Sequence, residues 1–509
     1  MKTRNERSWP GALIPLLTAL LLLLSWGAAQ GDDTLSIRAR NGDDMVTLDP
    51  AFYTGNEETV IDLAIYSKLI RYTPGGEDLA LDAAEWYELS DDGLELEFRL
   101  REGIQFHHGY GEMTAEDVKF SFERFLDEDS PYASDWATLR EVEVIDRYSG
   151  RIILDDVHAP LVNSVLPFTM GSIVSKAAFE DRGERFATNP VGSGPYYFAQ
   201  WDPNQRMVLE RFDEYYGEQP DFRRIEILPI VDPQIAEFSF DAGELDMTQI
   251  AFDSIPRYEN EPGVEVLVVD TLRYYWLGFN TQAAPFDDIR VREAVRYAVN
   301  VDEVLAGAFS SVPNRANTLL APSILGHWEE APEYEANVER AMELLAEAGF
   351  EDGFSTMITT DDVPEHQLSA AIIQQQLARI GIDAQINIVQ EIYETVGQDD
   401  TPGMHFASFS AVLDPGYWFE WFTCNQIGNW NYWKWCDEEF DQLKQEAERT
   451  AEPEERGWRY ERMQEIIDEA VTAVWITNGS TVYVYRSDEV DPSFVAMYAQ
   501  YPYFQQVEE

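Results

Sequence analysis

A helix, a glycine and a strand follow one another in the second half of the chain, and this order limits the possible folds. Apolar residues recur at helical spacing between residues 370 and 380, and Gly381 ends the helix that they predict. Apolar and polar residues then alternate from 382 to 388, which is typical of a strand with one buried face. A helix that leads through a glycine into a strand favours an α/β fold.

Other segments repeat these patterns. Residues 94–100 alternate as a strand, and Thr114 with Asp117 forms a capping box before a helical repeat that reaches residue 125. Asn337 can cap a second helix, which ends at Gly349. Hydrophobic residues make up 45% of the chain. A mature chain of about 480 residues exceeds what one core normally serves, so we expect two or three compact units.

The N-terminus resembles an export signal. A basic start with Lys2, Arg4 and Arg7 precedes the apolar run 13–24, and small residues follow up to Ala29. The alternative is a membrane anchor, but the run is shorter than the ~20 residues that a spanning helix needs. We expect cleavage after Ala29, with no cysteine nearby for lipid attachment. The sequence thus predicts a periplasmic protein that is not lipid-anchored.

The chain contains two cysteines, Cys424 and Cys436. An exported protein meets oxidising conditions, so a disulfide between them is the simplest expectation. The alternative is two buried thiols, and two cysteines alone do not complete a tetrahedral zinc site.

The formal net charge is −58, and only six of the 36 basic residues are lysines. Such a surface stays soluble and tolerates strong salt, whereas its self-repulsion destabilises the compact state in dilute buffer. A halophilic source is the simplest explanation, because a dedicated cation-binding protein would show acidic clusters and here the acids are spread along the chain. The same charge disfavours binding to nucleic acid or to an anionic membrane.

A glycine- and proline-rich turn at 189–195 leads into an alternating segment that reaches Trp201, and 209–217 follows. Gly192 and Gly194 permit backbone angles that other residues avoid. Taken together, this string closely resembles the block that marks the peptide/nickel class (family 5) of solute-binding proteins of ABC importers. Further segments that resemble family blocks come in the family's order, from about residue 35 to 490: 34–40, 47–50, 64–70, 106–109, 114–124, 275–280, 285–300, 341–350 and 376–382.

The resemblance implies an α/β clamshell of two lobes (type II, or cluster C), with an extra small domain on the first lobe. The chain would cross between the lobes near residues 275 and 485. The implied division is a signal peptide at 1–29, a first lobe from 30–55, 186–275 and 485–509, an extra domain at 56–185 and a second lobe at 276–484.

The family's function is ligand capture. The resemblance implies a monomer that encloses a small molecule between its lobes and presents it to the permease subunits of an ABC importer in the inner membrane. It implies neither a cofactor nor catalysis. A secreted glycoside hydrolase is the competing class, but acid pairs occur by chance among 94 carboxylates, and the chain has no G-x-S-x-G or H-E-x-x-H motif.

The ligand is less well determined. In peptide-binding relatives an aspartate three positions before an Asp-Pro pair holds the peptide's amino group, whereas here the pair is Asp414-Pro415 and Ala411 takes that position. The standard amine-binding mode is therefore disfavoured unless Asp414 substitutes for the missing carboxylate. Aromatic residues crowd the region from 417 to 435, as a core or as a stacking floor for a sugar or a peptide, so an oligosaccharide is as plausible as a peptide.

Six residues are the expected ligand contacts. Two lie where the chain enters the second lobe and four lie near the Asp-Pro pair: Tyr275, Trp276, Phe409, Asp414, Tyr417 and Trp418. A nickel or metal-complex ligand is a further alternative, because nickel binders belong to the same class. His107 and His108 are the only paired histidines, and neighbouring residues on a strand point to opposite faces, so we expect no metal ligands in this chain.

Overall fold

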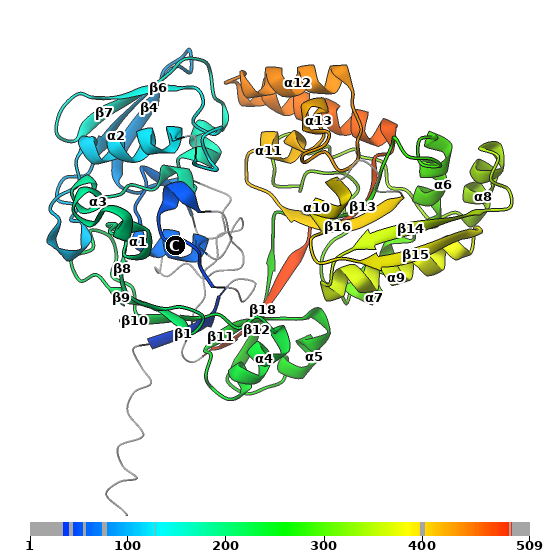
Figure 1. Cartoon of the computed structure of the whole chain (residues 1–509), viewed down its shortest axis with the longest axis horizontal. Coiled ribbons are helices and arrows are strands. Elements are labelled where there is room, and N and C mark those ends of the chain that lie inside the picture. The colour runs from blue at the N-terminus through cyan, green and yellow to red at the C-terminus, as the bar shows by residue number, and fades with distance from the viewer. Residues whose placement is uncertain are drawn as a thin grey trace, which may run out of the picture.

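The computed structural model describes residues 34–39, 44–53, 58–73, 79–127, 129–397, 403–487 and 490. The expected signal peptide lies outside these residues. The described chain forms two lobes, each built on a mixed sheet, and the sheets hold seven and five strands (Figure 1). This is the α/β clamshell that the sequence predicts.

The first lobe contains the seven-stranded sheet, in the order β12-β18-β11-β1-β10-β9-β8. Strand β1 is parallel to β10 and β11, and the other pairs are antiparallel. The strands are β1 (Thr34–Arg38), β8 (Tyr196–Asp202), β9 (Arg206–Arg211), β10 (Arg224–Leu228), β11 (Met247–Ile250), β12 (Val264–Asp270) and β18 (Ser480–Arg486). The helices of this lobe are α1 (Thr59–Ile65), α3 (Lys176–Arg182), α4 (Pro233–Asp241) and α5 (Ile255–Tyr258).

The turn before β8 owes its glycines to a close approach rather than to unusual angles. Neither Gly192 nor Gly194 has a positive φ. A Cβ on Gly192 would lie 2.0 Å from the carbonyl oxygen of Ile65, and one on Gly194 would lie 2.4 Å from that of Ala64. The turn therefore lies directly against the end of α1, where a side chain would collide with the backbone.

A smaller unit is inserted in the first lobe. Its four-stranded antiparallel sheet has the order β4-β5-β7-β6 and carries α2 (Ala115–Glu123), which begins with the predicted capping box of Thr114 and Asp117. The strands are β4 (Ala84–Leu89), β5 (Glu95–Leu100), β6 (Leu139–Val144) and β7 (Ser149–Leu154), and β2 (Ile70–Tyr72) pairs with β3 (Leu79–Leu81) beside them.

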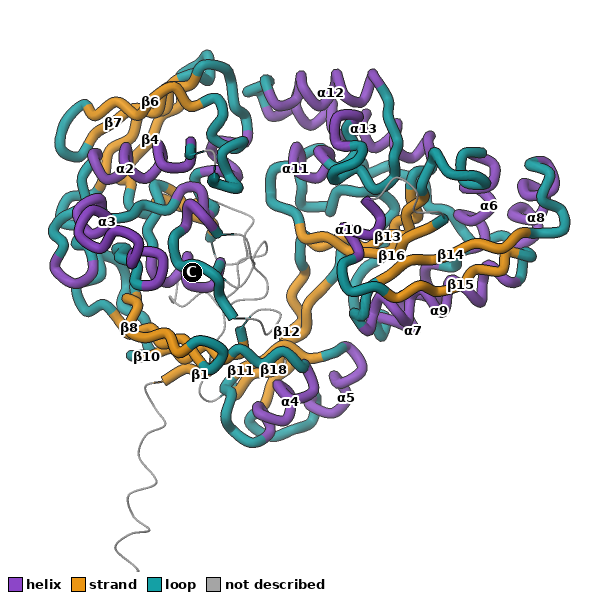
Figure 2. Tube along the Cα trace, in the orientation of Figure 1, coloured by secondary structure: helices purple, strands orange, loops and turns teal. Residues whose placement is uncertain are grey.

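The second lobe contains the five-stranded sheet, in the order β15-β14-β16-β13-β17, with β14 parallel to β15 and β16. Helices α7 and α9 lie along one face of it (Figure 2). The strands are β13 (Arg273–Phe279), β14 (Phe354–Thr360), β15 (Ile382–Ile388), β16 (Met404–Ser410) and β17 (Ala473–Thr477). The helices are α6 (Ile289–Ala298), α7 (Val301–Ala308), α8 (Val338–Glu347), α9 (Pro364–Ala378), α10 (Ile392–Gly397), α11 (Pro415–Glu420), α12 (Glu438–Glu448) and α13 (Pro453–Ala470).

The predicted helix, glycine and strand at 370–388 are α9, Gly381 and β15, and Gly381 has a φ of +86°. Asn337 caps α8 by accepting a hydrogen bond from the Arg340 amide. The chain passes between the two large sheets after β12 and again after β17. Strand β18 belongs wholly to the first lobe's sheet, so the second passage comes at residues 478–479 and not near the expected residue 485.

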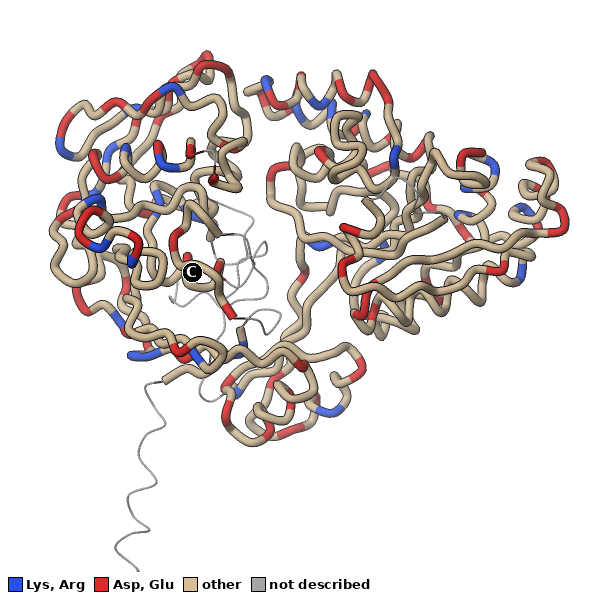
Figure 3. The backbone as a smooth tube through the Cα atoms, viewed as in Figure 1, with Lys and Arg blue, Asp and Glu red and all other residues tan. Residues whose placement is uncertain are grey.

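Acidic residues occur along the backbone of both lobes (Figure 3). We predict that the melting temperature rises by several degrees between 0.1 and 2 M potassium chloride, because the Debye length falls from about 10 Å at 0.1 M to about 3 Å at 1 M. A salt titration by differential scanning calorimetry checks this. As the control, the gain should shrink near pH 4, where many carboxylates are protonated. A melting temperature that is flat at pH 7 would contradict the halophilic interpretation.

Candidate ligand-binding site between the lobes

The two lobes touch where the segment after β7 meets the segment around α11 and α12. The Asp414 amide donates to Ser164 Oγ at 3.2 Å, and the Ala159 amide donates to the Glu448 carbonyl at 3.1 Å. Arg449 lies 3.2 Å from the Asp156 carboxylate. Figure 1 shows α12 next to the inserted unit of the first lobe. These contacts fix α11 opposite the first lobe, and α11 carries two of the expected ligand contacts.

The two expected tryptophan contacts are buried. Trp418 is 0% exposed, its ring stacks on Tyr274 at 5.0 Å, and its indole N–H donates to the Val412 carbonyl at 2.7 Å. Trp276 is also 0% exposed and stacks on the other side of Tyr274, at 5.0 Å. These three rings fill the core between the five-stranded sheet and α11. Neither indole is placed to touch a ligand, which corrects the sequence-based expectation for both.

Asp414 is likewise buried in the protein interior. Its carboxylate pairs with Arg456, with contacts of 2.7 and 2.8 Å, and both side chains are at most 3% exposed. Burial opposes the charge on Arg456, but Asp414 and Tyr460 outweigh it and raise the pKa of the guanidinium. The same carboxylate caps α11 by accepting from the Gly416 amide. Asp414 therefore does not replace the missing amine anchor, contrary to the possibility that the sequence left open.

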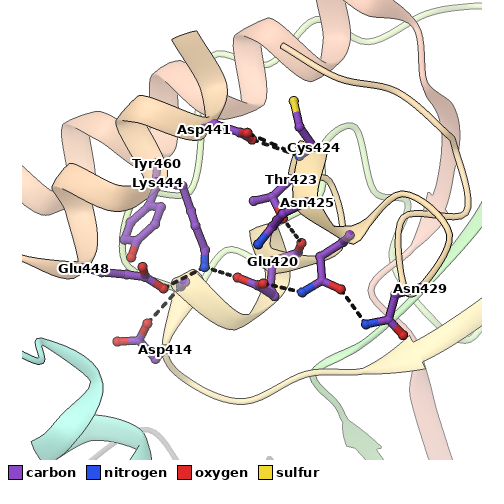
Figure 4. Close-up of polar contacts among 12 residues, drawn as sticks. Asp414, Glu420, Thr423, Cys424, Asn425, Asn429, Asp441, Lys444, Glu448 and Tyr460 are labelled. Atoms are coloured by element: carbon purple, nitrogen blue, oxygen red, sulfur yellow. Dashed lines mark hydrogen bonds and ion pairs between the residues drawn. The ribbon is translucent and has the colours of Figure 1, made fainter. Parts of the chain in front are cut away.

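The polar residues around the disulfide also bond to one another. The structure joins Cys424 to Cys436, as the sequence predicts. Lys444 lies between Glu420 and Glu448, and Glu420 accepts from Gln426 in turn (Figure 4). Both hydrogens of the Asn431 amide are used by backbone carbonyls. These amides support the fold of the α11–α12 region and do not form the polar lining that a sugar would need.

Of the three other expected contacts, Phe409 and Tyr417 are at least partly exposed, whereas Tyr275 is buried. Tyr417 is 36% exposed and lies parallel to Phe409, with 6.0 Å between ring centroids. Phe409 is partly exposed. Tyr275 lies on the opposite face of the sheet from Trp276, where its ring meets His366 edge-on. Phe409 and Tyr417 thus form a small aromatic surface on the second lobe.

Beside Tyr275 lies a polar network that sequence reasoning missed. His366 Nδ1 contacts the Asp361 carboxylate at 2.6 Å, and Nε2 contacts Ser408 Oγ at 3.0 Å. Burial raises the pKa of Tyr275, while hydrogen bonds with Arg273 and Ser408 act against that rise. The network therefore runs from Asp361 through His366, Ser408 and Tyr275 to Arg273.

Arg273 stands at the end of this network. Its Nε donates to Ser410 Oγ at 3.2 Å. Burial opposes its charge, but Tyr275, Tyr393 and Glu365 outweigh it and raise the pKa of the guanidinium. Arg273 begins β13, opposite the last residue of β16, and β16 runs parallel to β14. It therefore lies at the carboxyl edge of the parallel strands, the usual place for ligands in α/β sheets.

The turn at residues 130–136 belongs to the first lobe and carries Tyr132 and Asp135. Burial raises the pKa of Asp135 to about 6, and Asp135 in turn raises the pKa of Tyr417, after the larger effect of burial. Asp135 and Tyr417 also raise the pKa of Tyr132, after the larger effect of burial. The charge on Asp135 in the first lobe thus disfavours ionisation of Tyr417 in the second lobe. The turn gives no motif in the sequence.

Comparison with known proteins settles the family. The family described as "Bacterial extracellular solute-binding proteins, family 5 Middle" matches residues 78–430. The chain belongs to family 5 of the bacterial extracellular solute-binding proteins. These proteins bind small solutes, which they deliver to ABC importers, and they act in transport and not as enzymes.

The chain is 27% identical to the dipeptide-binding protein of Escherichia coli K12, over 85% of this chain and 86% of the relative. It is 28% identical to heme-binding protein A of Haemophilus influenzae, over 81% of each. Among solved structures, a periplasmic binding protein of Helicobacter pylori in complex with the peptide STSA superposes with a TM-score of 0.78 at 26% identity, covering 93% of this chain and 97% of that one.

Family membership gives no support to the glycoside hydrolase alternative. No cluster of three metal-binding side chains occurs among the described residues. His107 and His108 lie in a short 3-10 turn and not on the expected strand, and His107 is buried with its Nε2 2.9 Å from the Gly194 carbonyl. A search of the described residues for a bilayer-spanning helix also finds none.

Proposed function

We propose that this family 5 protein captures a small peptide-like solute with a free carboxylate between its lobes and delivers it to an ABC importer. The observation that carries the proposal is Arg273, a guanidinium at the interlobe edge that forms no ion pair with a described carboxylate. The chain has 94 acidic residues, and most of the other arginines that the structure describes are paired with one of them.

An arginine held this way is suited to a ligand anion. Arginine presents donors in a planar fork that matches a carboxylate, and such charge-assisted bonds are the strong ones. Ser410, Tyr275 and the His366–Ser408 pair hold the side chain from behind, so little freedom is lost on binding. A carboxylate at this point satisfies the guanidinium charge without further rearrangement.

The relatives favour peptides over the other candidates. The Escherichia coli relative is named a dipeptide-binding protein, and the Helicobacter pylori structure holds a peptide. The oligosaccharide alternative loses its main support, because Trp276 and Trp418 are buried and the neighbouring amides bond internally. A nickel or metal-complex ligand has no observation in its favour among the described residues.

The remaining features of the proposal come from the sequence. We propose a mature monomer that starts at Gln30, lies free in the periplasm of a halophilic bacterium and docks on the importer's permease subunits. The proposed division keeps 30–55, 186–275 and 485–509 as the first lobe, 56–185 as the extra domain and 276–484 as the second lobe. In this division, β13 and β18 are the strands whose sheets require a shift of the boundaries, to residues 272 and 479.

A thermal-shift screen of di- and tripeptides, followed by calorimetric titration of the tightest binder, tests the function. We expect saturable binding without released amino acids. The C-terminal amide of that peptide should bind about 10- to 100-fold more weakly, because a hydrogen bond to a charged group contributes about 1.5–3 kcal/mol. Arg273→Met should weaken binding of the free acid by the same factor and leave binding of the amide unchanged.

The matched control is Arg379→Met, which removes an arginine whose side chain is 54% exposed on the same lobe. This variant should bind the acid and the amide as the wild type does. Release of amino acids would show an enzyme instead of a carrier. Equal affinity for acid and amide would contradict the role of Arg273. If no peptide binds, the proposal of a peptide-like ligand is wrong.

A further inference from the structure

The second lobe contains a small cavity that is separate from the proposed ligand site. It measures about 20 Å³ and is lined by residues of α6, α7, the loop at 309–337, α13 and β17. Neither Arg273 nor any side chain that holds it lines this cavity. A water molecule needs roughly 10–15 Å³. The cavity therefore has room for one water molecule or one small ion.

The first cation at the cavity is Arg296 on α6, whose side chain is 9% exposed. Its Nη1 donates to the Asp468 carboxylate at 3.0 Å, and the guanidinium lies 3.7 Å from the centre of the Tyr334 ring. Its Nε–H is buried and has no hydrogen-bond partner among the described residues. Burying a donor without a partner is unfavourable, so this N–H needs an acceptor.

The second cation is Arg315 in the loop at 309–337, with a side chain that is 17% exposed. Its Nη2 donates to the Tyr334 carbonyl at 2.7 Å, and its Nη1 lies 3.3 Å from the Glu333 carboxylate. Its Nε–H is again buried, and no described residue accepts a hydrogen bond from it. Both arginines contact Tyr334, so two buried Nε–H donors without an acceptor belong to neighbouring side chains at one cavity.

Asn317 adds a third polar group to the lining. The Ala316 amide donates to the Ile476 carbonyl at 3.1 Å, and Arg315 forms a bridge with Thr477. The loop therefore runs beside β17 like a short strand, in which Arg315 and Asn317 point to the same side. Asn317 Oδ1 is buried and has no partner in the described part of the chain. Half a turn of this amide would offer its Nδ2–H as a donor instead.

Positive charge prevails at this cavity. Four described acids lie within 4.0 Å of the two guanidinium groups: Asp468, Glu293, Asp302 and Glu333. Of these, Asp468 lines the cavity, and it also accepts from the Tyr334 hydroxyl at 2.7 Å. The other three side chains are 34–77% exposed, so dissolved salt weakens their pairs. Two guanidinium groups thus share one carboxylate, which favours an anion over a neutral water molecule.

We propose that the cavity binds one chloride ion through the Nε–H groups of Arg296 and Arg315, with the Asn317 amide as a third donor. A monoatomic anion accepts hydrogen bonds from several directions, and its charge strengthens each of them. The bound ion fastens the loop at 309–337 to α6 and β17 and so stabilises the second lobe. Salt then acts on this protein in two ways, by screening its surface charge and by filling this site.

Thermal unfolding in potassium chloride and in potassium gluconate, at equal concentration, separates this site from screening, because gluconate is too large for the cavity. We expect the wild type to melt about 2–4 °C higher in chloride, the shift for a ligand present at several times its dissociation constant. Arg315→Met should abolish this difference. The matched control is Arg340→Met on the same lobe, which removes an arginine that contacts the exposed Glu343 and Glu347 and should keep the difference.

Crystals soaked in potassium bromide give a second test, since bromide replaces chloride and scatters anomalously. We expect an anomalous peak between Arg296 and Arg315 in the wild type. If Arg315→Met fails to fold, Asn317→Asp replaces it in the melting experiment, because the added carboxylate repels the anion. A chloride–gluconate difference that persists in the folded variant overturns the inference. Absence of the bromide peak also overturns it, because the cavity then holds a buried water molecule only.

Discussion

Replacement of Trp418 by alanine is expected to lower the free energy of unfolding by about 3–5 kcal/mol, the usual loss for a buried aromatic residue. The ring is 0% exposed, it stacks on Tyr274, and its N–H satisfies the Val412 carbonyl. Alanine leaves a cavity between α11 and the five-stranded sheet and an unpaired carbonyl beside it. Equilibrium unfolding in urea, followed by circular dichroism, measures the loss.

The control is Trp458→Ala on α13, because that ring is 59% exposed. Its removal should change stability by less than about 0.5 kcal/mol. Equal and small losses for the two variants would contradict the burial of Trp418. A folded Trp418→Ala protein with weakened peptide binding and unchanged stability would instead return that residue to the ligand site.

Local sequence patterns were sufficient to predict several helices and strands of the second lobe. The helix at 364–378, Gly381 and the strand at 382–388 form a unit in which each signal lies within a few residues of the next. The caps at Thr114 and Asn337 are equally local, since the capping side chain and its amide partner are three residues apart. Such features depend on neighbours in the sequence, so the sequence shows them directly.

Predicting the candidate site required knowing which face of the sheet each aromatic ring lies on. The periodicity of the sequence does not give that information. Tyr275 and Trp276 point to opposite faces of β13, and helices cover both faces, so both rings are buried. The clustered aromatics at 417–435 are mostly core for the same reason. Tyr417 and Trp430 are exceptions, at 36% and 42% exposure.

The residues that now carry the proposals gave no sequence signal. Arg273 forms no ion pair with a described carboxylate, a property that it shares with Arg292 and that no sequence pattern indicates. This property depends on which distant segments the fold brings nearby. In a chain with 94 acids, partners cannot be assigned from spacing alone.

Asp414→Asn is expected to cost about 3–5 kcal/mol of stability, because it leaves the buried Arg456 charge uncompensated. The asparagine can still cap α11, so the helix terminus is preserved and the loss reports the ion pair. Arg456 also donates to the Ala447 carbonyl and to the Tyr460 hydroxyl, and its displacement would loosen α12 from α13. Denaturant unfolding of both forms measures the difference.

Two comparisons separate the buried pair from charge effects in general. Asp155→Asn removes the partner of Arg140 from an exposed pair and should cost at most about 1 kcal/mol. The double variant Asp414→Leu with Arg456→Met should lose less than Asp414→Asn alone, since no buried charge is left unpaired. If Asp414→Asn is as stable as the wild type and loses peptide binding, the carboxylate serves the ligand.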